Sequence, residues 1–506
     1  LMDLSEDPQQ KEFRLKKLYL KLLKNIKQLQ NSISGGRTKA VLYKEEIYMN
    51  KPKIIVTGMC DTKFTELKFL AEQVKKAGGE VKIVNVGCGK PCDWTDVSLQ
   101  EVLDVNGIKQ EDVFKLPRAE AIKVVGEAGE KKIMQMYEAG EVDGIISWAG
   151  SMGTTTVTYL MRALPFGVPK VMLTDMASSD VSQWLGNKDI YIVNPTAEQG
   201  INVVTRKMVA NAAAAVVAMA KVGDVRDAET KPLMAITAYG TTTIAVNHCS
   251  QHFNEKGWDT IIIHQVGTGA TMEDLIRSGQ ITAIIDLTTG ELTNNMYDSV
   301  YGTPKTWNGE RVTAASDMGI PQIVTPGGCD QAAYNSIANM KQEYLEEYKT
   351  GKRRTWKDTG LPYIHNASVT IMYPTDEEIV ELSEYFAEKL NKTKGPTAFL
   401  IPMQGWSAYD QPEERACIEN GWAKGNGDGP QWEPDAKNPH WSKRSTMMRD
   451  ILKEKFDPNN ENLDLLCIDY NVNDPEFATI CETIMDSMLA GEWHKGMFRE
   501  LEGVIE

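Results

Sequence analysis

The run of glycine and hydroxyl residues from Ala149 to Thr156 (AGSMGTTT) is the segment of this sequence best suited to bind an anion. It follows the apolar run GIIS and precedes a helical pattern. Glycine lets a backbone approach a ligand closely, and the N–H groups at a helix start favour negative charge. We therefore predict an anion-binding cradle formed by Gly150, Ser151, Gly153, Thr154 and Thr155. The alternative is a tight turn without a ligand; a Walker A motif is excluded because no Gly-Lys-Ser/Thr follows.

Comparable polar loops follow apolar runs in the second half of the chain. The segment from Gly267 to Glu273 (GTGATME) begins like a dinucleotide-binding fingerprint, but Met272 occupies the position of the third glycine. It is therefore a weak Rossmann signal, although a second polar loop beside the same ligand is reasonable. The loop residues that we expect to contact the ligand in this half are Gly240, Thr241, Thr242, Gly267, Thr268, Gly269, Gly327 and Gly328.

Four titratable residues stand beside apolar runs, where catalytic groups commonly lie. Asp61 and Lys63 follow the first run, Glu291 follows IDLTTG, and His365 lies in YIHNASVTIM. Histidine and carboxylates are the usual proton carriers near neutral pH. We predict these four as the catalytic residues if the protein is an enzyme. Other roles stay open, because Asp61 can cap a helix and His365 can be structural.

The spacing of cysteine and histidine does not indicate a metal site. Cys88 and Cys92 lack a second Cys/His pair nearby, and His248 and His252, four apart on an expected helix, lack a third ligand. We expect the two histidines to lie on a solvated helix face. The eight cysteines are scattered, which is typical of a reducing cytoplasm. A serine hydrolase is disfavoured because the G-x-S-x-G elbow is absent around Ser407.

The polar loops occupy matched places in two halves of the chain. Four pairs of segments recur in the same order: KPKIIVTG with KPLMAITAYG, VKIVNVG with TIIIHQVG, VDGIISWAG with ITAIIDLTTG, and VPKVMLTDMAS with IPQIVTPGGCD. Short apolar runs that alternate with helical patterns predict parallel βαβ units, whose ligands bind at the carboxyl ends of the strands. The sequence therefore predicts an α/β protein with two related parallel-sheet, Rossmann-like domains and a ligand cleft between them.

Composition divides the chain into three parts. Residues 1–50 form a basic, helical extension, of which we expect residues 1–48 to be dispensable for folding, and residues 51–228 and 229–506 are the predicted N-terminal and C-terminal α/β domains. Two further strands are expected at 396–403 and 463–470, and a last helix at Asp474-Pro475. The net charge of −15 argues against nucleic acid as the main partner, and no apolar run approaches the roughly 20 residues of a membrane span. We expect a cytoplasmic protein.

The motifs taken together resemble a known family. The run VTGMCDTKFTELKFLAEQVKKAGGEV and the motifs WAGSMGTT, DLTTGEL, IPQIVTPGGCD, HNASVTIM and CIDYNVNDPEFA are similar to segments of the bacterial family related to the N-terminal domain of the tomato mosaic virus resistance protein, often called ATP-binding. The resemblance implies ATP or a related small anion at the loops, with Ala177 and Ser178 on the same family motif. Plant relatives append a phosphoenolpyruvate-hydrolase-like barrel, which a separate subunit could supply here. A homo-oligomer is also expected.

The chain departs from this family pattern at three positions. Met152 stands where relatives commonly have a second glycine, and arginines that they commonly carry are absent at Gln404 and near Tyr373. Loss of two cationic side chains favours a less charged ligand than a triphosphate, such as a small organic acid or a sugar derivative. The alternative function is therefore a metabolic enzyme, a hydrolase or a carbon–carbon lyase, that acts on such a compound in the same cleft.

Overall fold

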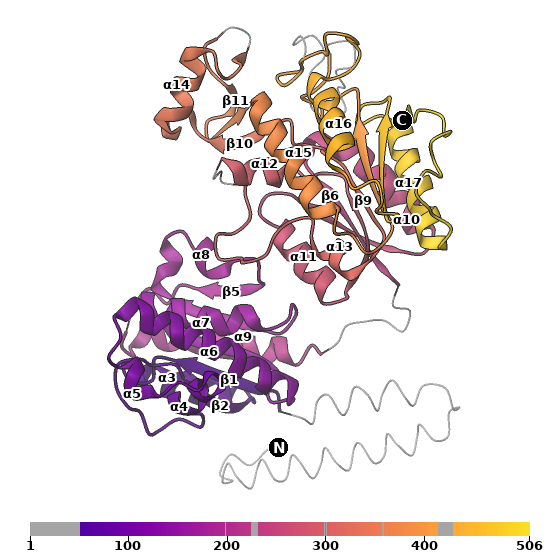
Figure 1. The fold of residues 1–506 in the computed structure, drawn as a ribbon. Helices are drawn as coiled ribbons and strands as arrows, with labels where there is room; N and C mark the ends of the chain where they lie inside the picture. The colour runs from indigo at the N-terminus through magenta and orange to yellow at the C-terminus, as the bar shows by residue number, and fades with distance from the viewer. Residues whose placement is uncertain are drawn as a thin grey trace, which may run out of the picture. The chain divides into compact units, whose positions relative to one another are not determined.

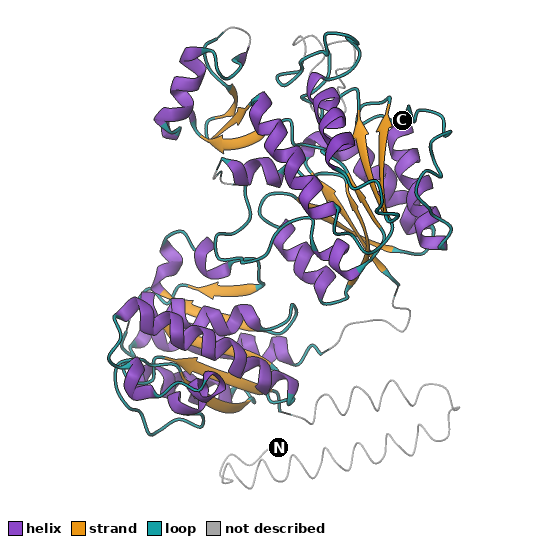
Figure 2. Cartoon of the chain, viewed as in Figure 1, coloured by secondary structure: helices purple, strands orange, loops and turns teal. Residues whose placement is uncertain are grey.

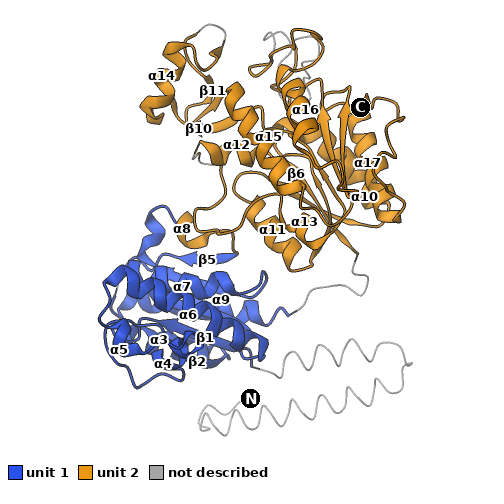
Figure 3. Cartoon of the chain, viewed as in Figure 1, with its two compact units in different colours: residues 1–181, 189–225 blue, residues 182–188, 226–506 orange. Residues whose placement is uncertain are grey.

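The chain folds into two compact α/β units, which Figure 3 distinguishes by colour. The computed structural model describes residues 51–197, 199–223, 231–297, 299, 301–356, 359–412 and 429–505. The N-terminal unit ends at Val225 and omits Ser182–Lys188, which belongs to the C-terminal unit together with Arg226–Glu506. The expected extension, residues 1–50, lies outside the described part of the chain. Both units have the predicted architecture of parallel strands alternating with helices (Figure 1).

Five parallel strands form the sheet of the N-terminal unit, in the order β2-β1-β3-β4-β5. The strands are β1 (Lys53–Gly58), β2 (Glu80–Asn85), β3 (Gly144–Ala149), β4 (Lys170–Thr174) and β5 (Ile190–Val193). Every residue of β3 and β4 is buried, as expected for strands that are covered on both faces. The strand order reverses between β1 and β3, which is the place where open parallel sheets bind ligands.

Helices cover this sheet in two packed pairs, α3 with α9 and α6 with α7 (Figure 2). The helices of the unit are α3 (Phe64–Lys76), α4 (Leu99–Leu103), α5 (Gln110–Val113), α6 (Arg118–Glu138), α7 (Ser151–Ala163) and α9 (Val203–Ala220), with the 3₁₀ turns η1 (Asp104–Asn106) and η2 (Asp175–Ser178). By length and composition alone, α9 is the one helix of the described residues that could cross a membrane. Its Val209, Ala213 and Val216 belong to the core that the sheet forms, as in the core helix of a globular unit.

The C-terminal unit contains a six-stranded parallel sheet in the order β14-β13-β9-β8-β6-β7. The strands are β6 (Leu233–Ala238), β7 (Asp259–His264), β8 (Ile281–Asp286), β9 (Gln322–Val324), β13 (Thr397–Pro402) and β14 (Leu463–Ile468). The helical elements are α8 (Ser182–Leu185), η3 (Gly240–Thr242), α10 (Thr243–Glu255), α11 (Gly269–Arg277), α12 (Glu291–Met296), α13 (Ala314–Met318), η4 (Ile337–Asn339), α14 (Gln342–Thr350), α15 (Asp376–Leu390), α16 (Lys443–Lys455) and α17 (Pro475–Ala490). The order reverses between β6 and β8, so this sheet has a switch point of its own.

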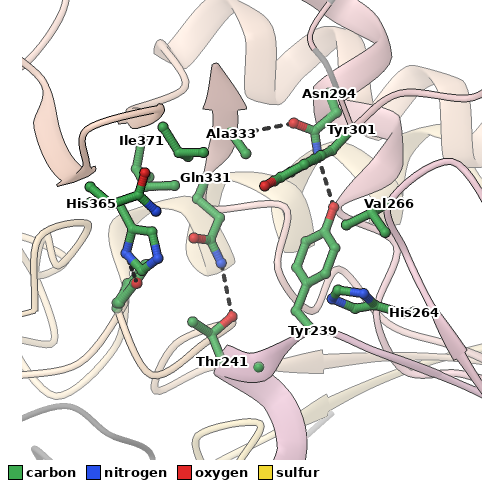
Figure 4. Close-up of a pocket in the computed structure, with 14 residues that line it drawn as sticks. Tyr239, Thr241, His264, Val266, Asn294, Tyr301, Gln331, Ala333, His365 and Ile371 are labelled. Carbon is green, nitrogen blue, oxygen red and sulfur yellow. Dashed lines mark hydrogen bonds between the residues drawn. The ribbon is translucent and has the colours of Figure 1, made fainter. Parts of the chain in front are cut away.

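A small antiparallel sheet is inserted into the C-terminal unit. Its strands β10 (Ala332–Asn335), β12 (Val369–Met372) and β11 (Tyr363–Asn366) lie in that spatial order, with β12 paired to both neighbours. Sequence patterns did not predict this sheet. It matters for function because it brings residues 363–372, which follow β9 by some forty positions, to the carboxyl end of β6 (Figure 4).

Candidate functional site

The N-terminal unit has a pocket of about 480 Å³ at its switch point. Residues that follow β1 and β3 form most of the wall, including Asp61, Lys63 and the segment from Gly150 to Gly153. The loop after β2 adds Cys88 and Gly89, and the start of α6 adds Arg118 and Ala121. Both halves of the predicted first-domain site, Asp61-Lys63 and the glycine-serine cradle, therefore lie around a single pocket.

Three helices begin at this pocket. Lys63 is the residue before α3, Arg118 is the first residue of α6, and Gly150 precedes α7. None of the three helix starts has a side-chain cap. The first N–H groups of each helix have no partner within their own helix, and the helix dipoles place positive potential there. Lys63 and Arg118 add two cationic groups to the same wall.

Asp61 lies in this wall with a carboxylate that holds the neighbouring loop. Its Oδ2 accepts a hydrogen bond from the N–H of Gly89 at 2.8 Å, and the residue is 9% exposed. A Cβ at Gly87 would stand 2.3 Å from Oδ1, so the loop needs glycine to wrap around the carboxylate. The alternative that Asp61 caps α3 is wrong, because Lys63 occupies the N-cap position and no side chain caps the helix.

The predicted cradle is only partly directed at the pocket. Gly150, Ser151 and Gly153 line it, whereas the Thr154 hydroxyl is buried and lies within hydrogen-bond distance of the Gly150 carbonyl, at 2.9 Å, and of Thr174 Oγ1, at 2.8 Å. The Thr155 hydroxyl donates to the Ser151 carbonyl at 3.0 Å. Because α7 already begins at Ser151, both threonines bond back to the preceding turn.

Two further residues predicted to bind the ligand, Ala177 and Ser178, lie away from the pocket wall. Ala177 and Ser178 lie in η2 after β4, and Ser178 donates to the Asp175 carbonyl at 2.9 Å; neither lines the pocket. A Cβ at Gly153 would stand 2.6 Å from the Cβ of Ala149. Gly153 therefore allows α7 to pack closely on the end of β3, in addition to lining the pocket.

The C-terminal unit has its own pocket, of about 560 Å³, beside the carboxyl ends of β6 and β7 (Figure 4). Tyr239, Gly240 and Thr241 follow β6, and His264 is the last residue of β7. Most of the remaining wall comes from α12, from the small antiparallel sheet and from the loop after β13, through Asn294, Ala333, His365, Asn366, Val369, Ile371 and Tyr409. Loop residues Val266, Tyr301 and Gln331 complete it. Of the predicted residues, Gly240, Thr241 and His365 lie here.

Hydrogen bonds fix the polar groups of this pocket. Asn294 Nδ2 donates to the Tyr239 hydroxyl at 2.8 Å, and Gln331 Nε2 donates to Thr241 Oγ1 at 2.9 Å. The Tyr409 hydroxyl and His365 Nδ1 are 3.1 Å apart. Burial lowers the pKa of His264, and burial, followed by the charge of Glu291, raises the pKa of Tyr239. Both groups are therefore neutral at neutral pH.

Glu291 does not line this pocket; it lies in a buried ionic cluster. Its Oε2 accepts from Arg311 Nε at 3.0 Å, and its Oε1 accepts from the N–H groups of Gly267 at 2.7 Å and Gly269 at 3.3 Å. Arg311 also binds Glu273 and Asp286, and all four charged side chains are buried. A Cβ at Gly269 would meet Glu291 Oε2 at 2.1 Å. The glycines of this loop thus accommodate the chain's own carboxylate, and the catalytic role predicted for Glu291 gains no support from its position.

Four other loop residues also lie outside the pocket. Thr242 is buried and shares a hydrogen bond with Thr288, and the Thr268 hydroxyl donates to the His264 carbonyl. A Cβ at Gly327 would meet the Leu287 carbonyl at 2.1 Å, and one at Gly328 would meet the Tyr239 ring at 2.7 Å. These residues shape the backbone around the pocket rather than its wall.

The four predicted catalytic residues are therefore not gathered in one pocket. Asp61 and Lys63 lie in the N-terminal pocket, His365 lies in the C-terminal pocket, and Glu291 lies in neither. Sequence reasoning missed Arg118, Tyr239 and Tyr409. Arg118 could have been found, because it follows Pro117 at a helix start. The cleft between the two domains stays a prediction.

His248 and His252, the two histidines on α10, lie beside carboxylates of α17. His248 Nδ1 lies 2.6 Å from Glu482 Oε1 and His252 Nε2 lies 2.9 Å from Asp486 Oδ2, so the two histidines pair with carboxylates of α17 rather than face solvent alone. Within the described residues, no group of three or more His, Cys, Asp or Glu side chains could hold a metal ion.

Gln404 donates to Asp469 and, like Tyr373, lines neither pocket. The absence of the family's arginines at these positions therefore does not change the charge of either pocket wall directly.

The fold and its pockets define a two-domain α/β protein with a ligand-sized pocket at the switch point of the N-terminal sheet and another beside the carboxyl ends of β6 and β7 in the C-terminal unit. Family models match both halves: residues 52–224 match the N-terminal domain, and residues 231–421 the C-terminal domain, of the uncharacterised protein family UPF0261. The chain belongs to this family.

Relatives in bacteria and plants agree with this assignment. The chain is 37% identical over 370 residues to a UPF0261 protein of Clostridium tetani, which covers 72% of this chain and 87% of that protein. A Rhizobium meliloti UPF0261 protein is 32% identical over 361 residues, covering 71% and 85% of the two chains. The ToMV resistance protein Tm-1 of Solanum lycopersicum is 26% identical over 465 residues, covering 87% of this chain and 56% of the tomato protein. The family resemblance is confirmed, whereas the ATP binding that it implies stays a prediction.

Proposed function

We propose that this protein binds a small organic anion, a nucleotide or another phosphate ester, in the pocket of its N-terminal unit. The observation that carries the proposal is the convergence of three uncapped helix starts, those of α3, α6 and α7, on one pocket. Helix N-termini attract anions through their N–H groups and their dipoles. ATP is the first candidate, because of the family resemblance.

The position of Arg118 supports an anionic ligand independently. A cation at the first residue of a 21-residue helix opposes the helix dipole, and no side chain caps that helix. A bound phosphate would interact favourably with the guanidinium and with the helix at the same time, and arginine can bind phosphate through two parallel hydrogen bonds.

The test is calorimetric titration of the full chain with ATP, AMP and inorganic phosphate. Hydrogen bonds to charged groups contribute about 1.5–3 kcal/mol, so Arg118→Ala should weaken binding by about 10- to 100-fold. Lys115→Ala is the matched control: it removes an exposed cation from the same segment that does not line the pocket, and affinity should not change. Absence of binding by all three anions, or equal losses in both variants, would contradict the proposal.

Catalysis in this pocket is the second candidate function. The observation in its favour is that a carboxyl group, Asp61, and an amine, Lys63, line the same wall. Hydrolysis of ATP that disappears in Lys63→Met while ATP still binds would support an enzyme. Binding without turnover in the unaltered protein would favour a binding role. The homo-oligomer and the phosphoenolpyruvate-hydrolase-like subunit remain proposals that rest on the family resemblance.

A further inference from the structure

We propose that the pocket of the C-terminal unit is a second binding site, for an uncharged heteroaromatic compound. This site is separate from the anion site proposed above and does not depend on it. The proposal rests on three properties of the wall: its lack of charge, its aromatic rings, and a hydrogen-bond donor and acceptor that are held in place (Figure 4).

The wall carries no acidic, lysine or arginine side chain among the described residues. Its titratable groups are two histidines and three tyrosines. Burial lowers the pKa of His264 and raises the pKa of Tyr239 and of Tyr409, which keeps these three groups neutral at neutral pH. A charged ligand would lose its hydration here without gaining a counter-charge, which is costly. The chemistry of the wall therefore favours a neutral ligand.

Aromatic rings stand on both sides of the pocket. Figure 4 shows His365 beside Ile371 on one side, and Tyr239, Tyr301 and His264 on the other. The Tyr239 and His264 rings meet edge to face, with centroids 6.1 Å apart and planes at 85°. Rings and aliphatic groups on opposite walls suit a flat, apolar-faced ligand between them, because aromatic pairs gain from stacked and edge contacts.

Two polar groups can read the edge of such a ring. The Tyr239 oxygen accepts from Asn294, so its own proton is available to a ligand. Gln331 uses its Nε2 to donate to Thr241, which leaves its carbonyl oxygen as an acceptor. Asn294 is itself held, since its Oδ1 accepts from the Ala333 N–H and from Ser299 Oγ. A heterocycle offers the complementary acceptor and donor at one edge.

A saccharide fits these observations less well. A sugar presents hydroxyls around its whole rim, whereas Val266, Ala333, Val369 and Ile371 make much of this wall apolar. Unpaired hydroxyls against such a wall would be costly. The volume, about 560 Å³, lies in the ordinary range of small-molecule pockets and admits a single ring with substituents.

The experiment is calorimetric titration of the full chain with uracil, cytosine, adenine and nicotinamide, with D-glucose and inorganic phosphate as comparison ligands. At least one heterocycle should bind. Gln331→Leu should weaken that binding by about tenfold or more, because it removes the acceptor and leaves the ligand donor unpaired. Tyr239→Phe, a milder change, should weaken it by several-fold.

Two controls separate this site from general effects. Tyr385→Phe makes the same chemical change outside the pocket, where the hydroxyl donates to the Arg311 carbonyl, and should leave the affinity for the heterocycle unchanged. Arg118→Ala should also leave it unchanged, although it weakens anion binding. The proposal is overturned if none of the four heterocycles binds, if glucose binds in their place, or if Tyr239→Phe, folded by its thermal transition, has no effect. Loss of heterocycle binding in Arg118→Ala would place the ligand in the N-terminal unit instead.

Discussion

Substitution of Asp330 should change how the stability of the C-terminal unit depends on pH. Asp330 and Asp410 are both fully buried, and one guanidinium, that of Arg444, lies near them. Arg444 binds Asp410 at 2.7 Å, whereas Asp330 accepts only from the Ser407 hydroxyl at 2.7 Å among the described residues. Burial, and then the charge of Asp410, raise the pKa of Asp330 to about 7.

The size and sign of the effect follow from this pKa. A rise from 3.8 to about 7 corresponds to at most about 4 kcal/mol of differential stabilisation of the protonated form. Because the folded-state pKa lies above the unfolded value, this stabilisation is complete below about pH 4. It is lost as the pH rises through about 7. Since Asp330 and Asp410 titrate together, we expect a loss of a few kcal/mol for the pair.

Asp330→Asn mimics the protonated acid at every pH. At pH 8 the variant should be more stable than the unaltered chain by about 2–4 kcal/mol, and at pH 5 the difference should shrink to about 1.5 kcal/mol. Urea unfolding followed by hydrogen–deuterium exchange in peptides from residues 397–412 measures the C-terminal unit alone.

The matched variant is Asp410→Asn, which removes the partner of a buried guanidinium and should destabilise the unit by about 3–5 kcal/mol at both pH values. An Asp330→Asn chain whose stability falls with pH as steeply as that of the unaltered chain would refute the reasoning.

Two further substitutions test the packing of the loops around the pockets. Gly153→Ala places a Cβ 2.6 Å from the Cβ of Ala149 and should destabilise the N-terminal unit by about 1–3 kcal/mol, without any ligand present. The loss is measured as a lower temperature of thermal unfolding. An unchanged unfolding temperature would show that α7 shifts freely. Arg311→Met leaves three buried carboxylates without their counter-charge and should cost about 3–5 kcal/mol in denaturant unfolding. Arg277→Met, at a half-exposed pair with Asp317, should cost no more than about 1 kcal/mol, and equal losses in the two variants would contradict this account.

Apart from β5, the parallel strands could be predicted because each is a local apolar run that ends at a glycine or polar loop. The start of α17 at Pro475 is also confirmed, since proline at a helix start is a local signal. The strand β5 and the small antiparallel sheet were missed. Their strands have four residues each, and β11 (YIHN) is mostly exposed, so its place depends on pairing with β12 rather than on its own pattern.

The pocket residues were also predictable only in part, where a local sequence signal marks them. The segment from Gly150 to Gly153 lies in a pocket because glycine and serine at a strand end act locally through the backbone. The roles of Thr154 and Thr155 depended on where α7 begins, which is the least certain feature of a sequence pattern. The Tyr239–Asn294 and His365–Tyr409 contacts join residues far apart in the chain, and no local signal marks them.

Matched glycine loops in the two halves of the chain each donate to a carboxylate of the chain itself. The sequence predicted that Gly267 and Gly269 contact the bound ligand, and in the structure both N–H groups donate instead to a carboxylate side chain. That carboxylate is Glu291, from the segment that matches the glycine-serine cradle of the first half. Because α11 begins at Gly269, the C-terminal unit supplies its own anion at this helix start, and Arg311 neutralises the charge. The loop of the first half that matches Gly267–Gly269 follows β2, and there the Gly89 N–H donates to Asp61 Oδ2 at 2.8 Å. Both halves therefore place one of their own carboxylates against this glycine loop. The difference lies in the surroundings of the carboxylate: Glu291 is buried with Arg311, whereas Asp61 lines a pocket together with the two cations Lys63 and Arg118, which favours an external anion there.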